Sequence, residues 1–153
     1  MFDFEKLDIY KKAKCFNSDI RRLIKSTKLD PTTKDQLRRA SFSIVLNIAE
    51  GSGRFSKADR RNFYVISRCS IFECIAILDV LKDETILDEN QFESLYLQAE
   101  VISKMLYAMI KNLSWNGSTI QSLRVQNPDF NVRVFYLIPW NNPRFLHGFY
   151  NLT

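Results

Sequence analysis

Residues 37–54 read LRRASFSIVLNIAEGSGR, and this stretch decides the fold. It predicts a helix whose core-facing stripe holds Leu37, Ala40, Ile44 and Ile48. Other apolar residues of the same helix point elsewhere: Phe42, Val45, Leu46 and Ala49. A helix that is apolar on several sides needs cover on each of them. A single chain of 153 residues can hardly supply that cover, so we expect a second copy of the chain to pack on this helix.

Outward from this stretch, apolar residues recur at steps of three and four, which indicates amphipathic helices. The predicted helices are 4–25, 33–50, 57–81 and 88–113. Capping pairs mark three of the starts: Thr33 with Gln36, Ser56 with Asp59, and Asp88 with Gln91. The third helix is expected to bury a face made of Phe63, Ile66, Ser70, Ile71, Cys74, Ile75, Leu78 and Leu81. Four helices with short connections predict an all-α fold, an antiparallel up-down-up-down four-helix bundle.

The last forty residues have a different character. Trp115-Asn116-Gly117 signals a turn, and the run VRVFYLIP is β-prone. This segment is rich in aromatic residues, which a solvated linker is not. The sequence therefore predicts a bundle domain at 1–113 and, at 114–153, an irregular or β-prone arm that packs on the bundle or on a neighbouring subunit. An appendage without a role is the open alternative.

Charge is distributed unevenly along the chain. Residues 1–70 hold 16 lysines and arginines against 8 acidic residues, whereas residues 71–113 hold 3 against 8. Such a split is typical either of a basic face for nucleic acid or of basic and acidic surfaces that meet within or between subunits. No apolar run is long enough to cross a membrane, and the acidic N-terminus is unlike a signal peptide, so we expect a cytoplasmic protein without a membrane partner.

The sequence lacks the residues that several kinds of catalytic and metal-binding site require. The single histidine, His147, does not provide for a histidine-rich metal site or a serine protease triad. The run from Gly51 to Ala58 departs from a P-loop at Ser56 and Ala58 and follows a helix rather than a strand. The three cysteines have no metal-like spacing and are interpreted as small buried residues. We therefore expect no catalytic residues, no metal and no cofactor, and hence no enzyme.

The end of the second predicted helix is unusual. Glu50 lies in its last turn, where the helix dipole disfavours a carboxylate, so we expect a structural link to Arg54, Arg60, Arg61 or the next helix start. Gly51 and Gly53 then suit a turn that uses positive φ.

Several separated elements agree in order and spacing with a known pattern: Arg38-Arg39-Ala40, Ser43-Ile44, Asn47-Ile48-Ala49-Glu50-Gly51, Gly53-Arg54, Phe63, and Ser70 with Glu73. Over residues 2–113 the chain resembles the four-helix bundle proteins encoded by intervening sequences of bacterial 23S rRNA genes. The resemblance implies a left-handed antiparallel bundle, a homopentameric ring and no enzymatic activity. Related proteins include the accessory variability determinant of diversity-generating retroelements, which binds a reverse transcriptase and nucleic acid.

Two hypotheses follow for the site. A nucleic-acid-binding bundle would use the cations of the second and third helices: Arg38, Arg39, Arg54, Lys57, Arg60 and Arg61. Lacking an aromatic stacking motif, it would bind the phosphate backbone and respond to salt. A scaffold or accessory subunit would instead bind a protein partner, such as a reverse transcriptase. The expected structural and interface residues are Phe42, Leu46, Asn47, Glu50, Gly51 and Gly53.

Overall fold

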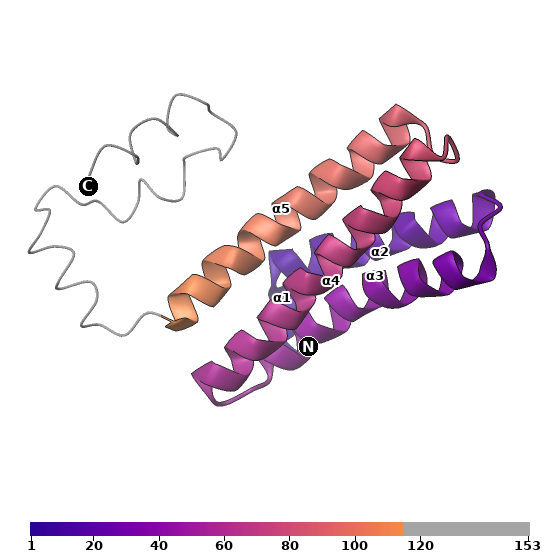
Figure 1. Cartoon of the computed structure of the whole chain (residues 1–153). Coiled ribbons are helices and arrows are strands. Elements are labelled where there is room, and N and C mark those ends of the chain that lie inside the picture. The colour runs from indigo at the N-terminus through magenta and orange to yellow at the C-terminus, as the bar shows by residue number, and fades with distance from the viewer. Residues whose placement is uncertain (115–153) are drawn as a thin grey trace, which may run out of the picture. The chain divides into compact units, whose positions relative to one another are not determined.

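The computed structural model describes residues 1–114, which lie within one compact unit and form five helices and no strand. These are α1 (Asp3–Lys6), α2 (Asp8–Ser26), α3 (Pro31–Ser52), α4 (Lys57–Asp83) and α5 (Glu89–Ser114). Each long helix contacts the next one along the chain, and α2 also contacts α5. The four long helices therefore close into an antiparallel bundle (Figure 1), which confirms the predicted all-α fold.

The core runs along the bundle axis and takes side chains from all four long helices. Its fully buried members include Phe16, Ile20, Leu37, Ile44, Ile48, Ile71, Leu78, Ile102 and Leu106. Burying each such side chain is favourable by about 1.5–3 kcal/mol relative to leaving it in water. The predicted stripe of the second helix is confirmed, because it lies in this core, to which α5 contributes Leu95, Ala99, Ile102 and Leu106.

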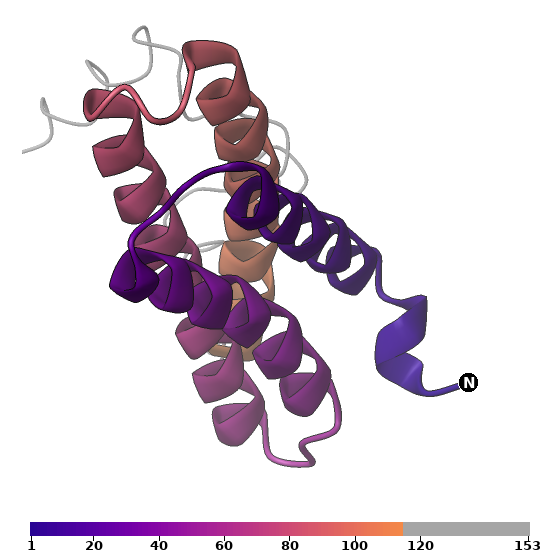
Figure 2. The ribbon, with the colours of Figure 1, turned by 90° about the vertical axis from the view of Figure 1, so that its right-hand side faces the viewer.

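The first predicted helix, 4–25, is interrupted in the structure. Leu7 has extended backbone angles, φ −72° and ψ 124°, and separates α1 from α2. Figure 2 shows α1 turned away from the line of α2. This break lets the ring of Phe4 meet the ring of Tyr10 edge-on, with centroids 4.8 Å apart. Residues six apart on one continuous helix face different sides and would not meet.

The start of α3 also differs from the prediction. Asp30, not Thr33, caps this helix, and its carboxylate accepts hydrogen bonds from the backbone N–H groups of Thr32 and Thr33. Pro31 occupies the first helical position, where its fixed φ fits and its missing N–H costs nothing. Asp30 and Pro31 together form the stronger start signal, so the helix begins two residues earlier. The caps of α4 and α5 are as predicted, with Ser56 accepting from Asp59, and Asp88 and Gln91 bonded reciprocally.

The predicted buried face of α4 is confirmed at Ser70, Ile71, Cys74, Leu78 and Leu81, but in the first turns of the helix the buried face is rotated from the predicted one. Ile66 is 48% exposed, whereas Tyr64 and Ser67 are buried. The Ser67 hydroxyl donates to the carbonyl of Ile44 at 3.0 Å, so a serine replaces the isoleucine at the contact with α3. A satisfied hydroxyl can be buried at little cost, which is why the apolar pattern alone misplaced this face.

The structure also bears on the predictions for the cysteines, for membrane-spanning helices and for the C-terminal arm. Cys74 is buried, and burial raises the pKa of its thiol to about 12, but Cys15 and Cys69 are exposed because their positions fall outside the buried stripes. In the described part of the chain, no helix is long and apolar enough to cross a membrane. The predicted arm, 114–153, lies outside the described residues except for Ser114, which ends α5.

Candidate nucleic-acid interface

A polar network joins α3 to α4. The Asn47 side-chain amide donates to the Ser43 carbonyl at 2.8 Å and to its hydroxyl at 3.0 Å. The Ser43 hydroxyl lies 2.9 Å from the hydroxyl of Ser70 on α4. Asn47 therefore orients the serine that bridges the two helices, and it acts within the chain. Ser43 and Ser70 belong to the family pattern, but their mutual contact was not expected from the sequence.

Gly51 and Gly53 do not use positive φ, which corrects the prediction for this turn. Gly53 has φ −84°, and no glycine of the described residues has a positive φ. Gly51 is instead buried in the last turn of α3, where a Cβ would lie 2.6 Å from a ring carbon of Tyr64. Glycine is required there because α3 and α4 approach closely. That approach places the end of α3 beside the start of α4.

Two cations of the α3–α4 turn, Arg54 and Arg60, are held by contacts with groups of α3, of α4 and of the turn itself. Arg54 lies 3.5 Å from the carboxylate of Glu50 and 4.4 Å from the ring centre of Phe63. Arg60 donates to the carbonyl of Arg54 at 2.8 Å. Glu50 is thus linked to α4 through Arg54, which is one of the structural links that the sequence predicted. Because Glu50 and Arg54 are about half exposed, their ion pair contributes little stability.

The remaining cations of this end point outward. Arg61 Nε donates to the Ser114 hydroxyl on α5 at 2.6 Å. Lys57 is exposed at the start of α4. Within residues 1–114, the four cations Arg54, Lys57, Arg60 and Arg61 form one ion pair, that of Arg54 with Glu50.

Arg38 and Arg39 do not belong to this group. They lie two turns into α3, and about 21 Å of helix separates Arg38 from Ser52, the last helical residue before the turn, at 1.5 Å per residue. Both contact Asp35, Arg38 at 2.6 Å and Arg39 at 3.8 Å. The hydrogen bond from Arg38 lowers the pKa of the Asp35 carboxyl below its usual value. The structure therefore separates the six predicted site cations into two sets.

Two apolar side chains of α3 face outward. Phe42 is 41% exposed and Leu46 is 43% exposed, and Ile66 on α4 is similarly accessible. The guanidinium of Arg21 lies 5.4 Å from the Phe42 ring centre and covers it only in part. Val45 is buried in the core, which corrects the prediction for that residue, whereas residues 1–114 leave Phe42 and Leu46 exposed.

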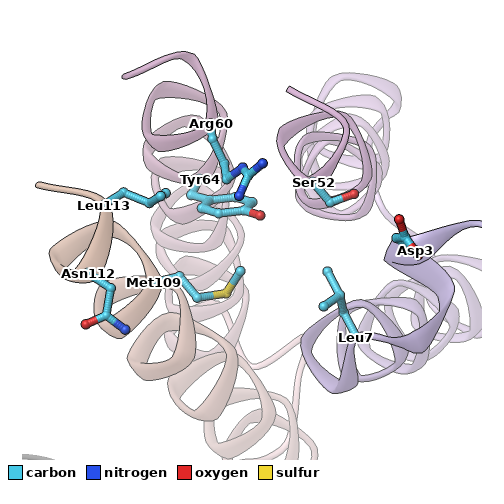
Figure 3. A pocket seen from close by; sticks show the side chains of 8 residues that line it. All are labelled: Asp3, Leu7, Ser52, Arg60, Tyr64, Met109, Asn112 and Leu113. Atoms are coloured by element: carbon cyan, nitrogen blue, oxygen red, sulfur yellow. The ribbon is translucent and has the colours of Figure 1, made fainter. Parts of the chain in front are cut away.

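A cavity of about 350 Å³ opens at the end of the bundle near the cations. Its lining consists of Asp3, Leu7, Ser52, Arg60, Tyr64, Met109, Asn112 and Leu113. Figure 3 shows Tyr64 and Met109 pointing into this space from α4 and α5, with Leu7 opposite. Burial raises the pKa of the Tyr64 hydroxyl, and the charge of Arg60 opposes that rise. Within residues 1–114, no three potential metal ligands gather in one place.

The sequence interpretation missed a cluster on the outer side of α4 and α5. The guanidinium of Arg68 lies 4.7 Å from the ring centre of Phe72 and 5.6 Å from that of Tyr107. The i, i+4 spacing of Arg68 and Phe72 was the available signal, because it places both on one face of a helix. The partner ring comes from another helix, and spacing along the chain does not reveal it.

Comparison with known proteins places the chain in a family. No curated protein matches it. A solved structure, the crystal structure of a protein with unknown function from the S23 ribosomal protein family of Bacteroides thetaiotaomicron, is 26% identical, with a TM-score of 0.65. The match covers 67% of this chain and 98% of that chain. The family model of the 23S rRNA-intervening sequence protein matches residues 5–108. The chain described here therefore belongs to the 23S rRNA-intervening sequence protein family.

Proposed function

We propose that the protein is a non-enzymatic homo-oligomer that binds RNA or DNA through a basic surface. The observation that supports this most is the group of cations around the α3–α4 turn. Arg54, Lys57, Arg60 and Arg61 lie within eight residues and form one ion pair among residues 1–114. Uncompensated cations of this kind attract phosphates. RNA as a ligand implies action in the cytoplasm.

Assembly would multiply this charge. The exposed Phe42 and Leu46 support contact between copies, since an apolar patch on one helix face favours a protein partner. The number five follows from the family resemblance alone. A ring of five copies would present five groups of cations to one nucleic acid molecule, which increases avidity without new contacts.

Salt dependence tests the binding. If the surface contacts Z phosphates of a duplex, the logarithm of affinity should fall with the logarithm of salt concentration at a slope of about −0.9Z. We expect Lys57→Glu with Arg61→Glu to weaken binding of a structured RNA and to flatten this slope. The matched control, Lys12→Glu with Lys25→Glu, reverses two exposed lysines of α2. It should leave the affinity for RNA and the salt slope unchanged. A salt-independent affinity would refute the proposal.

The second candidate function is a scaffold or accessory subunit for a protein partner, such as a reverse transcriptase. The same apolar face on α3 and α4 favours it. Light scattering of Leu46→Asp should show smaller particles if copies meet there. The control Leu97→Asp changes a leucine on α5 that is also exposed, and it should not reduce particle size. Particles that stay large in Leu46→Asp would remove this face from the assembly.

Reversal of Arg38 and Arg39 to glutamate separates the two candidates. Intact oligomers that no longer bind nucleic acid favour the binding role. Loss of assembly favours an interface role for these arginines and, with it, the scaffold.

A further inference from the structure

Arg68 occupies an unusual place on the outer surface of α4 and α5. Its guanidinium lies between the rings of Phe72, one turn along α4, and Tyr107 on α5. Both rings are accessible, with Phe72 52% exposed and Tyr107 44% exposed. Lys111 lies one turn from Tyr107, with its ammonium 5.9 Å from the same ring centre. Two accessible rings and two cations therefore share one surface.

The arginines of this surface lack acidic partners among residues 1–114. None of the ion pairs there includes Arg61 or Arg68. The Nε of Arg68 is buried without a hydrogen-bond partner, and Arg61 donates to the neutral hydroxyl of Ser114. Lys104, one turn before Tyr107, differs, because it is paired with Glu100 at 2.9 Å. The positive charge of Arg61 and Arg68 is thus available to an anion.

The register of α4 against α5 places these residues in one continuous strip on the surface. Arg61 contacts Ser114 and Arg68 contacts Tyr107, so the pairs are separated by seven residues on both antiparallel helices. Seven residues span about 10.5 Å of helix, two turns on the same face. We call Arg61, Arg68, Phe72, Tyr107 and Lys111 the α4–α5 strip.

We propose that the α4–α5 strip binds single-stranded nucleic acid, with phosphates on Arg61 and Arg68 and a base stacked on Tyr107 or Phe72. This inference rests on the proposed function and specifies its ligand. Proteins that bind single strands combine a cationic track with aromatic platforms for bases. In a duplex the base faces are already stacked, so rings on a convex helix surface do not reach them. Stacking of a base on a ring is stronger than an exposed cation–π contact, so the base can displace Arg68 toward a phosphate.

The α4–α5 strip would add contacts to bases to the binding of the phosphate backbone that the sequence predicts. The aromatic residues of the strip come from two helices, so no contiguous motif announces them. The cations of the α3–α4 turn provide contacts to the backbone, and the strip adds recognition of unpaired bases. Arg61 belongs to both sets.

The test measures fluorescence anisotropy of the full-length protein with a twelve-nucleotide oligo-dT and with a hairpin duplex of the same charge. Tyr107→Leu should weaken binding of the single strand about tenfold, the loss of one stacked base, and change duplex binding less than twofold. The control is Tyr96→Leu, because Tyr96 lies on the same helix with the same exposed fraction, 44%, and should leave both affinities unchanged. Arg68→Gln should weaken the single strand and reduce its salt slope by about 0.7. Circular dichroism of each variant checks that the bundle is folded.

Each outcome decides the matter. If the wild type binds nucleic acid in a salt-dependent way but Tyr107→Leu behaves as Tyr96→Leu does, the strip is overturned and the proposed function stands. If the wild type binds neither oligonucleotide at any salt concentration, both fail. If Tyr107→Leu and Arg68→Gln reduce binding of oligoglutamate instead, the strip takes an acidic protein segment, and the nucleic-acid assignment is overturned.

Discussion

Gly51 provides the most direct test of how α3 and α4 are joined. A Cβ at this position would lie 2.6 Å and 2.9 Å from two ring carbons of Tyr64 and 3.1 Å from the Cβ of Phe63. Carbon atoms in good contact are about 3.5–4.0 Å apart, so Gly51→Ala creates an overlap of roughly 1 Å. Tyr64 is only 3% exposed, and its ring can yield only toward the cavity that it lines. The substitution must therefore push α3 away from α4 or twist the ring.

The magnitude follows from two opposing effects. Overpacking a filled core costs about 1–3 kcal/mol. Replacing glycine by alanine inside a helix returns about 1 kcal/mol. We therefore expect Gly51→Ala to lower the free energy of unfolding by up to about 2 kcal/mol. For a chain of this length that corresponds to a fall in Tm of roughly 2–4 °C for each kcal/mol.

Gly53 is the matched control, two residues away. A Cβ there would lie 3.6 Å from the carbonyl oxygen of Glu50, an ordinary contact, and its φ of −84° suits any residue. Gly53→Ala should therefore be neutral or stabilise by up to about 1 kcal/mol, because the unfolded chain loses freedom. Equilibrium denaturation of both variants at one protein concentration gives the comparison, since assembly makes stability concentration-dependent.

A second substitution tests whether the ring of Tyr64 causes the loss of stability in Gly51→Ala. In a background of Tyr64→Leu, which removes the ring, Gly51→Ala should cost less than in the wild type, and a double-mutant cycle measures the difference. If Gly51→Ala is as stable as Gly53→Ala, the close approach is not what requires glycine, and the reasoning is wrong.

Three further predictions concern single groups. Ser67→Ala should destabilise by about 1 kcal/mol in denaturation, because the hydrogen bond to the Ile44 carbonyl is lost, whereas Ser18→Ala on the exposed side of α2 should not. The Asp30 carboxylate caps α3, and hydrogen bonds lower its pKa from 3.8. The stability that it contributes is therefore present above pH 3.8 and is lost as pH falls through the lower pKa of the folded state. Unfolding curves of wild type and Asp30→Asn should converge in that range. Cys74, with a pKa of about 12, should react with a thiol reagent only after unfolding, and rapid labelling of the native protein at Cys74, read by mass spectrometry, would contradict its burial.

Hydrophobic periodicity predicted the helices well, because most of the stabilisation of a bundle comes from apolar stripes. The stripe of Leu37, Ala40, Ile44 and Ile48 is buried as expected. The errors lie at positions where local geometry outweighs that period. Leu7 fits the amphipathic pattern but adopts an extended conformation that pairs two aromatic rings. At Asp30 and Pro31, capping chemistry moved the helix start.

The site was harder to predict because contacts between helices determine it. The sequence identified the cations around Gly53, which are close in the chain. It grouped Arg38 with them, although about 21 Å of helix separates it from Ser52, where α3 ends before the turn. It did not find the Arg68 cluster, since Tyr107 is distant in sequence. Residues that meet across two helices leave no local pattern.

The apolar character of α3 has a physical explanation in its contact with α4. Small residues occupy the inside of that contact, with Gly51 against Tyr64 and Ser43 against Ser70. The large residues of the α3 stripe, Leu37, Ile44 and Ile48, are fully buried in the core. The large apolar residues of α3 that do not fit the core, Phe42 and Leu46, are left on the outside. The helix register that places the stripe in the core of one chain therefore leaves, on another side of α3, the apolar surface by which we propose that copies assemble.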